Sequence, residues 1–190
     1  GLSALVTVGI VAGISRNIGE GKLDTARSNT WRSLKLAAVL GIFFTLFLYP
    51  LIVPLVDVIK LEPVAYKAGI QYLQIMIFAT VLSFLMFSLH SVMIAWGDTK
   101  TPVAVYAVTF VFNIFFSPVL MFGIGPFPRL ETRGAAIATV VSYFLGALVF
   151  FIIVIRKKWI LFKPVGEEIR FRRYISVGYP VAMSSMIFSF

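Results

Sequence analysis

The sequence predicts an all-α fold, a polytopic transmembrane helical bundle. Four long stretches of the 190-residue chain carry no Asp, Glu, Lys or Arg: residues 36–56, 68–97, 101–128 and 134–155. A hydrocarbon core about 30 Å thick needs about 20 apolar residues at about 1.5 Å each, and every stretch reaches that length. Backbone groups in lipid must be satisfied within the segment, so these stretches are expected to be helices rather than strands.

Both ends of the chain are apolar, since residues 1–15 and 174–190 carry no charge and no Met opens the sequence. We therefore expect a fragment with six spans, of which four are complete, the first lacks its beginning and the last lacks its end. The expected organisation is a group of helices over 1–155, a linker over 156–173 and the start of a second group over 174–190.

The composition agrees with a membrane protein, because 59% of the residues are hydrophobic and 13% are charged. The net charge of +9 does not indicate nucleic-acid binding, since the basic residues lie at span ends and form no stripe between stacking aromatics. We expect membrane lipids, and no nucleic acid, as partners. The absence of Cys excludes disulfides and any Cys-based metal site or nucleophile.

Basic residues alternate between the two sides of the predicted spans. The connections on one side carry 13 of them, namely Arg16, Lys22, Arg27, Arg32, Lys35, Lys100, Arg156, Lys157, Lys158, Lys163, Arg170, Arg172 and Arg173. The other side carries 4, namely Lys60, Lys67, Arg129 and Arg133. The positive-inside rule assigns the first set to the cytoplasm.

Turn residues separate the spans. Residues 97–102 read as a tight cytoplasmic turn, with Thr101 as N-cap and Pro102 at the first helical position. Pro50 and Pro54 predict a kink or an early end of the second span. In the segment 156–173, aromatic and aliphatic residues alternate with seven basic residues, which is typical of a linker lying in the membrane interface; an ordinary basic loop is the alternative.

The candidate enzyme motifs in the sequence lack residues that their chemistry requires. Residues 16–22 resemble a P-loop only superficially, because Arg16 replaces the first Gly and Leu23 replaces the Mg²⁺-binding Ser or Thr. His90 is the single histidine and has no metal-ligating partner nearby in sequence. The sequence predicts neither an enzyme nor a metal site, and it implies no cofactor.

Asn113 is the most informative polar residue inside a span. It lies 11 residues after Pro102, roughly 16 Å along the helix and near the midplane, and Ser117 follows one turn later on the same face. Pro118 then removes a backbone hydrogen bond from that turn. The site suits a cation or a proton-carrying water, and an interhelical hydrogen bond that only packs the bundle is the alternative.

Other polar and small residues favour packing. Gln71, Gln74, Thr80, Ser83 and Ser88 either line a cavity or hold helices together, and we favour the second interpretation. In the fifth span small residues recur at fourfold spacing, which predicts close helix packing; they are Gly134, Ala138, Ser142 and Gly146.

Four segments resemble the multidrug and toxic compound extrusion (MATE) family in order and spacing: residues 15–21, 94–102, 113–118 and 134–139. The family motifs fall on residues that we expect to be structural, namely Arg16, Gly19, Gly21, Gly97, Asp98, Pro102, Pro118 and Gly134. The resemblance implies binding roles for Asn113, Thr139 and, as an altered position, Ser117.

The resemblance implies a fold of twelve helices in two lobes around a central cavity. The chain then covers helices two to six of the first lobe (1–155), the linker (156–173) and the start of the second lobe (174–190), and the rest of the same polypeptide completes it. It further implies a multi-pass protein of the cytoplasmic membrane that exports organic cations or drugs in exchange for Na⁺ or H⁺.

Ser117 departs from the family pattern, because many prokaryotic members carry Asp at this position, directly before the Pro. Coupling through this lobe is therefore open. The alternatives are a lipid-linked oligosaccharide flippase of the related superfamily, which would show more basic residues inside its spans, and a structural membrane subunit without transport. A channel would need rings of charge that this chain lacks.

Overall fold

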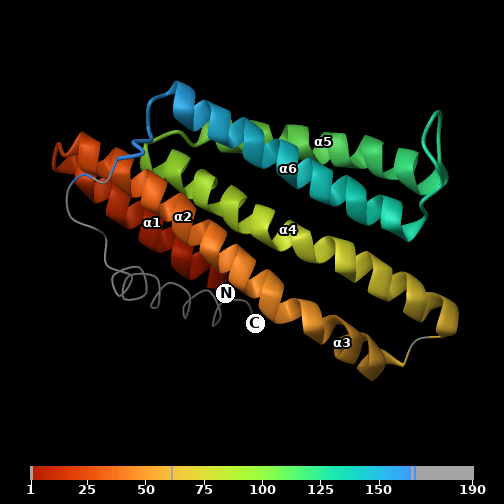
Figure 1. Cartoon of the computed structure of the whole chain (residues 1–190). Coiled ribbons are helices and arrows are strands. Elements are labelled where there is room, and N and C mark those ends of the chain that lie inside the picture. The colour runs from red at the N-terminus through yellow and green to blue at the C-terminus, as the bar shows by residue number, and fades with distance from the viewer. Residues whose placement is uncertain (1, 61, 164, 166–190) are drawn as a thin grey trace, which may run out of the picture.

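The computed structural model of the chain describes residues 2–60, 62–163 and 165, and it is helical without strands over that part (Figure 1). The elements are α1 (Leu2–Gly19), α2 (Leu23–Leu48), the short 3₁₀ helix η1 (Tyr49–Leu51), α3 (Ile52–Ile59), α4 (Pro63–Ala95), α5 (Lys100–Phe122) and α6 (Thr132–Arg156).

Four helical segments are long and apolar enough to cross a membrane. They are Leu23–Ile59, Pro63–Ala95, Lys100–Phe122 and Thr132–Arg156, with mean hydropathies between 2.0 and 2.6. Each contains most or all of one of the four uncharged stretches, so the complete spans predicted from the sequence are confirmed. The chain is a multi-pass helical membrane protein.

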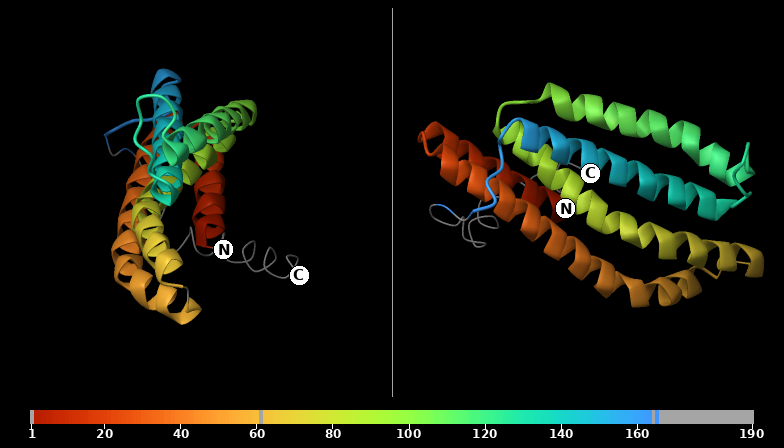
Figure 2. Two further views of the ribbon diagram at one scale, coloured as in Figure 1. Left: turned by 90° about the vertical axis from the view of Figure 1, so that its right-hand side faces the viewer. Right: turned by 45° about the horizontal axis from the view of Figure 1, so that its top comes forward.

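Helix α4 is the centre of the arrangement. It packs against α1 and α2 on one side and against α6 on the other, and α5 packs on α6 while barely touching α4. Figure 1 and the right-hand view of Figure 2 both show α4 between α2 and the pair formed by α5 and α6. The pocket described below lies where α4 and α5 diverge.

The connections lie alternately at the two ends of the bundle. The α1–α2 turn, the α4–α5 turn and the end of α6 lie at one end, and the α3–α4 and α5–α6 connections lie at the other (Figure 1). The described basic residues of the larger set, among them Lys22, Lys100 and Arg156, thus belong to one end, and Lys60 and Arg129 belong to the other. The alternation is confirmed, and the cytoplasmic assignment remains a prediction.

The prolines near the end of the second span interrupt the helix, as the sequence predicts. Helix α2 ends at Leu48, the 3₁₀ helix η1 contains Pro50, and α3 continues the segment until Lys60 closes it with a left-handed backbone (φ 52°). Because Pro50 has no backbone N–H, the regular hydrogen-bond ladder cannot pass through this point.

The turn between α4 and α5 corrects the cap predicted from the sequence. The structure places the N-cap at Thr99 and begins α5 at Lys100, so Thr101 is inside the helix and Pro102 is two residues past its start. The capping acceptor is instead Asp98, whose carboxylate accepts hydrogen bonds from the Thr101 backbone N–H (3.0 Å) and hydroxyl (2.6 Å). A carboxylate is a better capping acceptor than a hydroxyl here, because it accepts two hydrogen bonds and its negative charge is stabilised by the positive end of the helix dipole.

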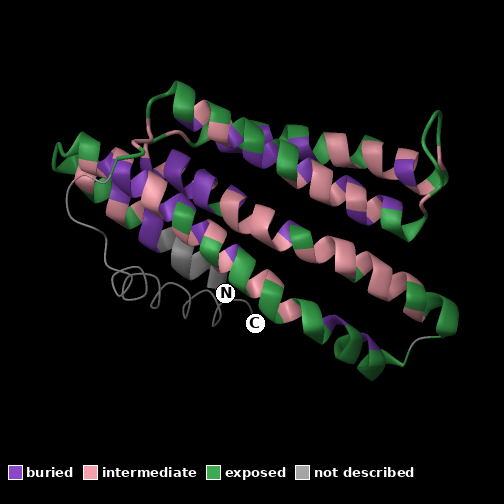
Figure 3. Ribbon diagram, in the orientation of Figure 1, coloured by how far each residue is buried: buried purple, intermediate pink, exposed green. Residues whose placement is uncertain are grey.

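Burial is inverted relative to a water-soluble bundle. Large apolar side chains such as Val39, Leu46 and Val108 are 63%, 70% and 68% exposed, whereas Asn29 and Ser33 of α2 are fully buried. Buried residues gather in the half of the bundle that ends at the α1–α2 turn (Figure 3). Apolar surface faces outward because lipid is as apolar as the core, so the helices gain from close packing instead.

The small residues of α6 allow this close packing, as the fourfold spacing predicts. Gly134, Ala138, Ser142 and Gly146 are all buried. A Cβ atom added at Gly134 would lie 2.6 Å from the backbone carbonyl of Leu120 in α5, and one at Gly146 would lie 2.7 Å from the Thr109 hydroxyl. Helices α5 and α6 therefore meet at a distance that only small side chains permit.

The start of the predicted linker folds back onto the helices. The Trp159 ring stacks on Trp96 at the end of α4, with centroids 5.5 Å apart, and the Leu161 N–H donates to the Arg27 carbonyl (3.1 Å). These residues pack on protein, although Phe162 is 55% exposed. Residues 166–173 of the predicted linker and 174–190 lie outside the described residues, so the domain boundaries there remain predictions.

Candidate functional site

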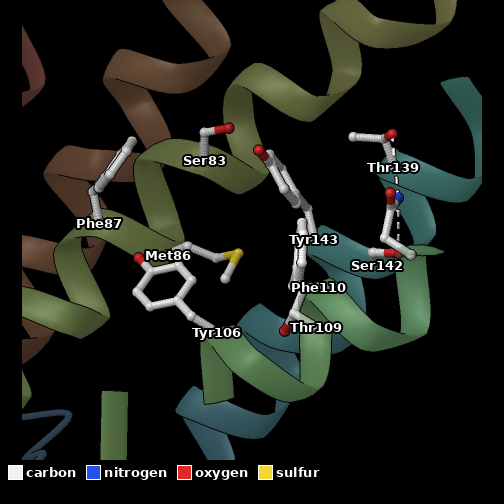
Figure 4. A pocket seen from close by; sticks show the side chains of 10 residues that line it. Ser83, Met86, Phe87, Tyr106, Thr109, Phe110, Thr139, Ser142 and Tyr143 are labelled. Carbon is white, nitrogen blue, oxygen red and sulfur yellow. Dashed lines mark hydrogen bonds between the residues drawn. The ribbon is translucent and has the colours of Figure 1, made fainter. Parts of the chain in front are cut away.

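A pocket of about 410 Å³ lies between α4, α5 and α6 (Figure 4). It forms because α5 leans on α6 and diverges from α4, which leaves a space that the side chains do not fill. Its lining comprises Ser83, Met86 and Phe87 of α4, Tyr106, Thr109, Phe110 and Asn113 of α5, and Thr139, Ser142 and Tyr143 of α6.

The amide of Asn113 bridges α5 and α6 at one wall of this pocket. Its Nδ2 group donates hydrogen bonds to Thr139 Oγ1 and to Ser142 Oγ, both at 3.3 Å, and Figure 4 marks these bonds with dashed lines. The interhelical bonds expected from the packing alternative are therefore present. The same amide also lines the pocket, so packing and binding are not exclusive here.

The two hydroxyls fix the direction in which the amide points. Thr139 Oγ1 donates to the Ala135 carbonyl (3.0 Å) and Ser142 Oγ donates to the Ala138 carbonyl (2.7 Å). With their protons used, both hydroxyl oxygens can only accept, so the NH₂ side of Asn113 must face them. Within the described part of the chain the Asn113 Oδ1 atom has no donor, and it can accept from a protonated ligand or coordinate a cation.

The rest of the lining is aromatic and uncharged. Tyr106, Phe110 and Tyr143 place ring surfaces around the space, and none of the lining residues is Asp, Glu, Lys or Arg. The Tyr106 hydroxyl is buried and has no hydrogen-bond partner among the residues described. Aromatic faces attract cations through their quadrupoles, so an amide oxygen among such rings suits a flat organic cation.

The structure brings together two of the three residues for which the sequence predicts binding. Asn113 and Thr139 meet in the pocket, whereas the Ser117 hydroxyl donates to Met121 Sδ at 3.7 Å and does not line it. Pro118 lies inside α5, which continues to Phe122.

Sequence reasoning missed Tyr106, Thr109 and Met86. Thr109 and Tyr106 precede Asn113 by four and seven residues, and this spacing on one helical face could have identified them. No comparable signal exists for Met86, which comes from another helix.

Several of the expected motif residues lie in the turns at the basic end of the bundle. Gly21 and Gly97 adopt left-handed backbone conformations (φ 74° and 83°) in the two turns, which glycine tolerates best. Glu20 accepts from Arg16 at 2.7 Å and from Lys22 at 2.8 Å. Hydrogen bonds from Lys22 and then Arg16 lower the pKa of the Glu20 carboxyl to about 2.

His90 contacts the edge of the Tyr106 ring, with centroids 5.6 Å apart, and lies outside the pocket lining. No group of three or more His, Asp or Glu side chains that could hold a metal ion occurs among the described residues.

Comparisons with known proteins agree with this arrangement. The model of the MatE family matches residues 2–119. The chain is 31% identical over 188 residues to the probable multidrug resistance protein NorM of Thermotoga maritima, covering 96% of this chain and 40% of that protein. It is 26% identical to the FAD transporter of Shewanella oneidensis, covering 96% of this chain and 42% of that protein.

Solved structures share the fold. A structure described as the inward-facing conformation of a multidrug resistance MATE family transporter of the MOP superfamily superposes with a TM-score of 0.84 at 21% identity, over 96% of this chain and 42% of that one. The bundle of four membrane-length helices with an interhelical pocket defines the chain as part of a polytopic membrane protein. The chain belongs to the MatE family, and it spans about two fifths of the length of these relatives.

Proposed function

We propose that the protein to which this chain contributes exports small organic cations across the cytoplasmic membrane in exchange for Na⁺ or H⁺. The observation that carries the proposal is the Asn113 amide oxygen, which has no donor among the described residues and lies on the wall of an uncharged, aromatic pocket. The multidrug resistance name of the Thermotoga maritima relative supports the substrate class.

The coupling carboxylate is expected outside this chain. The four complete spans contain no Asp or Glu away from their ends, where Asp57, Glu62, Asp98 and Glu131 lie. A carboxylate changes its charge on binding a proton or pairs with Na⁺, whereas an amide can only coordinate or relay. Asn113 therefore takes the role of an oxygen ligand beside an acid supplied by the remaining polypeptide.

The lining argues against phosphate-bearing substrates at this site. One relative is named an FAD transporter, and a lipid-linked oligosaccharide carries pyrophosphate in the same way. Either substrate would need Lys or Arg in the pocket to pair with its phosphates, and the lining residues include neither. An organic cation is the better match to the rings of Tyr106 and Phe110.

Efflux from proteoliposomes with the full-length protein tests the proposal. Asn113→Leu is expected to insert and fold normally and to lose most cation-driven efflux of an organic cation such as ethidium. Gln74→Leu is the matched control, because it removes an amide from a span, in α4, without touching the pocket. If Asn113→Leu kept wild-type efflux per folded molecule and lost only thermal stability, the amide would be a packing group and the proposal would be wrong.

A further inference from the structure

A second groove lies between α2 and α6, with α4 as its floor. It has a volume of about 310 Å³ and is lined by seven uncharged residues and the side chain of Lys35; the seven are Trp31, Leu34, Ala38, Leu85, Leu89, Ala147 and Phe151. Leu85 lies roughly 200° around α4 from Ser83, at about 100° per residue, so this groove faces away from the pocket that contains Asn113. The two spaces are separate.

One charged residue contributes to the groove. Lys35 is exposed, and its Nζ atom lies 5.1 Å from the centroid of the Trp31 ring one turn earlier on α2. Within the part of the chain that the structure describes, no acid pairs with this ammonium, and the lining contains no Asp or Glu. The groove thus has an apolar lining, to which Lys35 contributes its methylene chain, and one ammonium group beside its Trp31 wall.

Lys35 marks the level at which the hydrocarbon begins. It is the last charged residue before the uncharged stretch 36–56, and Trp31 beside it is an aromatic of the kind that gathers at membrane interfaces. From this level the groove runs along Ala38 and Ala147 into the apolar part of the bundle. A polar headgroup and an acyl chain meet at the same boundary in a bilayer.

The walls of the groove continue into surface that suits lipid. Val39 and Ile42 of α2 are 63% and 49% exposed, and Leu148 and Ile152 of α6 are 42% and 41% exposed. Such continuous apolar surface on two membrane-spanning helices would be unfavourable in water and is neutral against acyl chains.

We propose that this groove is a binding site for one anionic phospholipid. Its acyl chain lies in the apolar channel between Leu34, Leu89 and Phe151, and its phosphate pairs with Lys35 at the Trp31 end. The positive end of the groove selects an anionic headgroup over a zwitterionic one, because a basic residue near the membrane surface attracts anionic lipid. By the charge distribution this is the inner-leaflet side.

Native mass spectrometry of the full-length protein, titrated with phosphatidylglycerol and in parallel with phosphatidylcholine, tests the site. The wild type is expected to retain one phosphatidylglycerol more tightly than phosphatidylcholine. Lys35→Gln should weaken the retained phosphatidylglycerol about fivefold, the usual effect of one basic residue near an anionic surface, and leave phosphatidylcholine unchanged. Lys158→Gln is the charge-matched control, since Lys158 is exposed at the same end and does not line the groove.

A groove-filling variant tests the apolar half of the proposal. Ala38→Phe should lower the retention of both lipids, because the ring occupies the channel. Lys35 is exposed, so Lys35→Gln is expected to fold. The comparison of this variant with the wild type therefore tests the lipid site even if Ala38→Phe fails to fold. Equal phosphatidylglycerol binding by the wild type and Lys35→Gln, or equal losses in Lys35→Gln and Lys158→Gln, would overturn the proposal.

Discussion

Lys157 Nζ lies 2.5 Å from Asp98 Oδ2, so the residue that follows α6 is tied to the turn between α4 and α5. The same ammonium lies over the Trp159 ring (4.6 Å to the centroid), and Trp159 in turn stacks on Trp96. Asp98 also caps α5 through Thr101, and its side chain is only 14% exposed. One carboxylate thus joins the ends of three helices.

Asp98→Asn is expected to destabilise the full-length protein by about 1–2 kcal/mol, the scale of charge-assisted hydrogen bonds at a partly exposed site. Hydrogen bonds from Lys157 and then Thr101 hold the pKa of the Asp98 carboxyl well below its ordinary value of 3.8. A depressed pKa means that the stabilisation is complete above that ordinary value and is lost as the pH falls further below it. Thermal unfolding midpoints should therefore differ between wild type and variant at neutral pH and converge in strong acid.

Gly134→Ala is expected to destabilise the protein by about 1–3 kcal/mol, because the new methyl group would collide with the backbone of Leu120, which cannot move aside like a side chain. Gly19→Ala is the matched control, since a Cβ there meets nothing within 4 Å. That control should be neutral or slightly stabilising. Equal unfolding midpoints for the two variants would contradict the close approach of α5 and α6.

Ser117→Ala is expected to leave ion-driven efflux within about twofold of the wild type, since its hydroxyl bonds to Met121 and does not reach the pocket. Initial rates of efflux from proteoliposomes, normalised to folded protein, provide the measurement. Complete loss of coupling in this variant would instead show that the serine itself takes part in coupling.

Single Cys substitutions test the orientation of the spans, because the chain has no native Cys. Cys at Lys22 or Lys100 should resist an impermeant thiol reagent applied to intact cells, and Cys at Glu62 or Leu130 should react, as the 13 to 4 distribution of basic residues predicts. The opposite labelling pattern would reverse the topology. Labelling after permeabilisation shows that the protected positions are reactive.

The spans could be predicted from the sequence because a bilayer imposes one simple requirement, a long uncharged helix. The full length of the helices that contain these spans could not be predicted. Helix α2 begins at Leu23, well before the uncharged stretch, because Asp24 and Arg27 pair at its surface while Asn29 and Ser33 turn inward. Charge patterns identify where the hydrocarbon begins, and they do not show how far a helix extends beyond it.

The site could be predicted only where one helix carried the signal. Asn113 stood out because an amide near the midplane needs partners, but the sequence could not show that Ser142 is one of them. Residue preference predicts Thr101 as the cap, whereas the structure shows that the Asp98 carboxylate accepts the hydrogen bond from the Thr101 backbone N–H. Both outcomes depend on which side chains meet across helices, and periodicity within one helix does not contain that information.

The attachment of α5 has a mechanical consequence. Among the described helices, α5 packs extensively only on α6, and the face of α5 that carries Tyr106 and Asn113 borders the space between α4, α5 and α6. The width of that space is therefore set by a single angle, between α5 and α6, and not by a rigid wall. Under the proposed transport function, a small rotation of α5 on α6 would change the width of this space and so admit cations of different thickness, and the Asn113 bonds to Thr139 and Ser142 would be the first contacts to adjust.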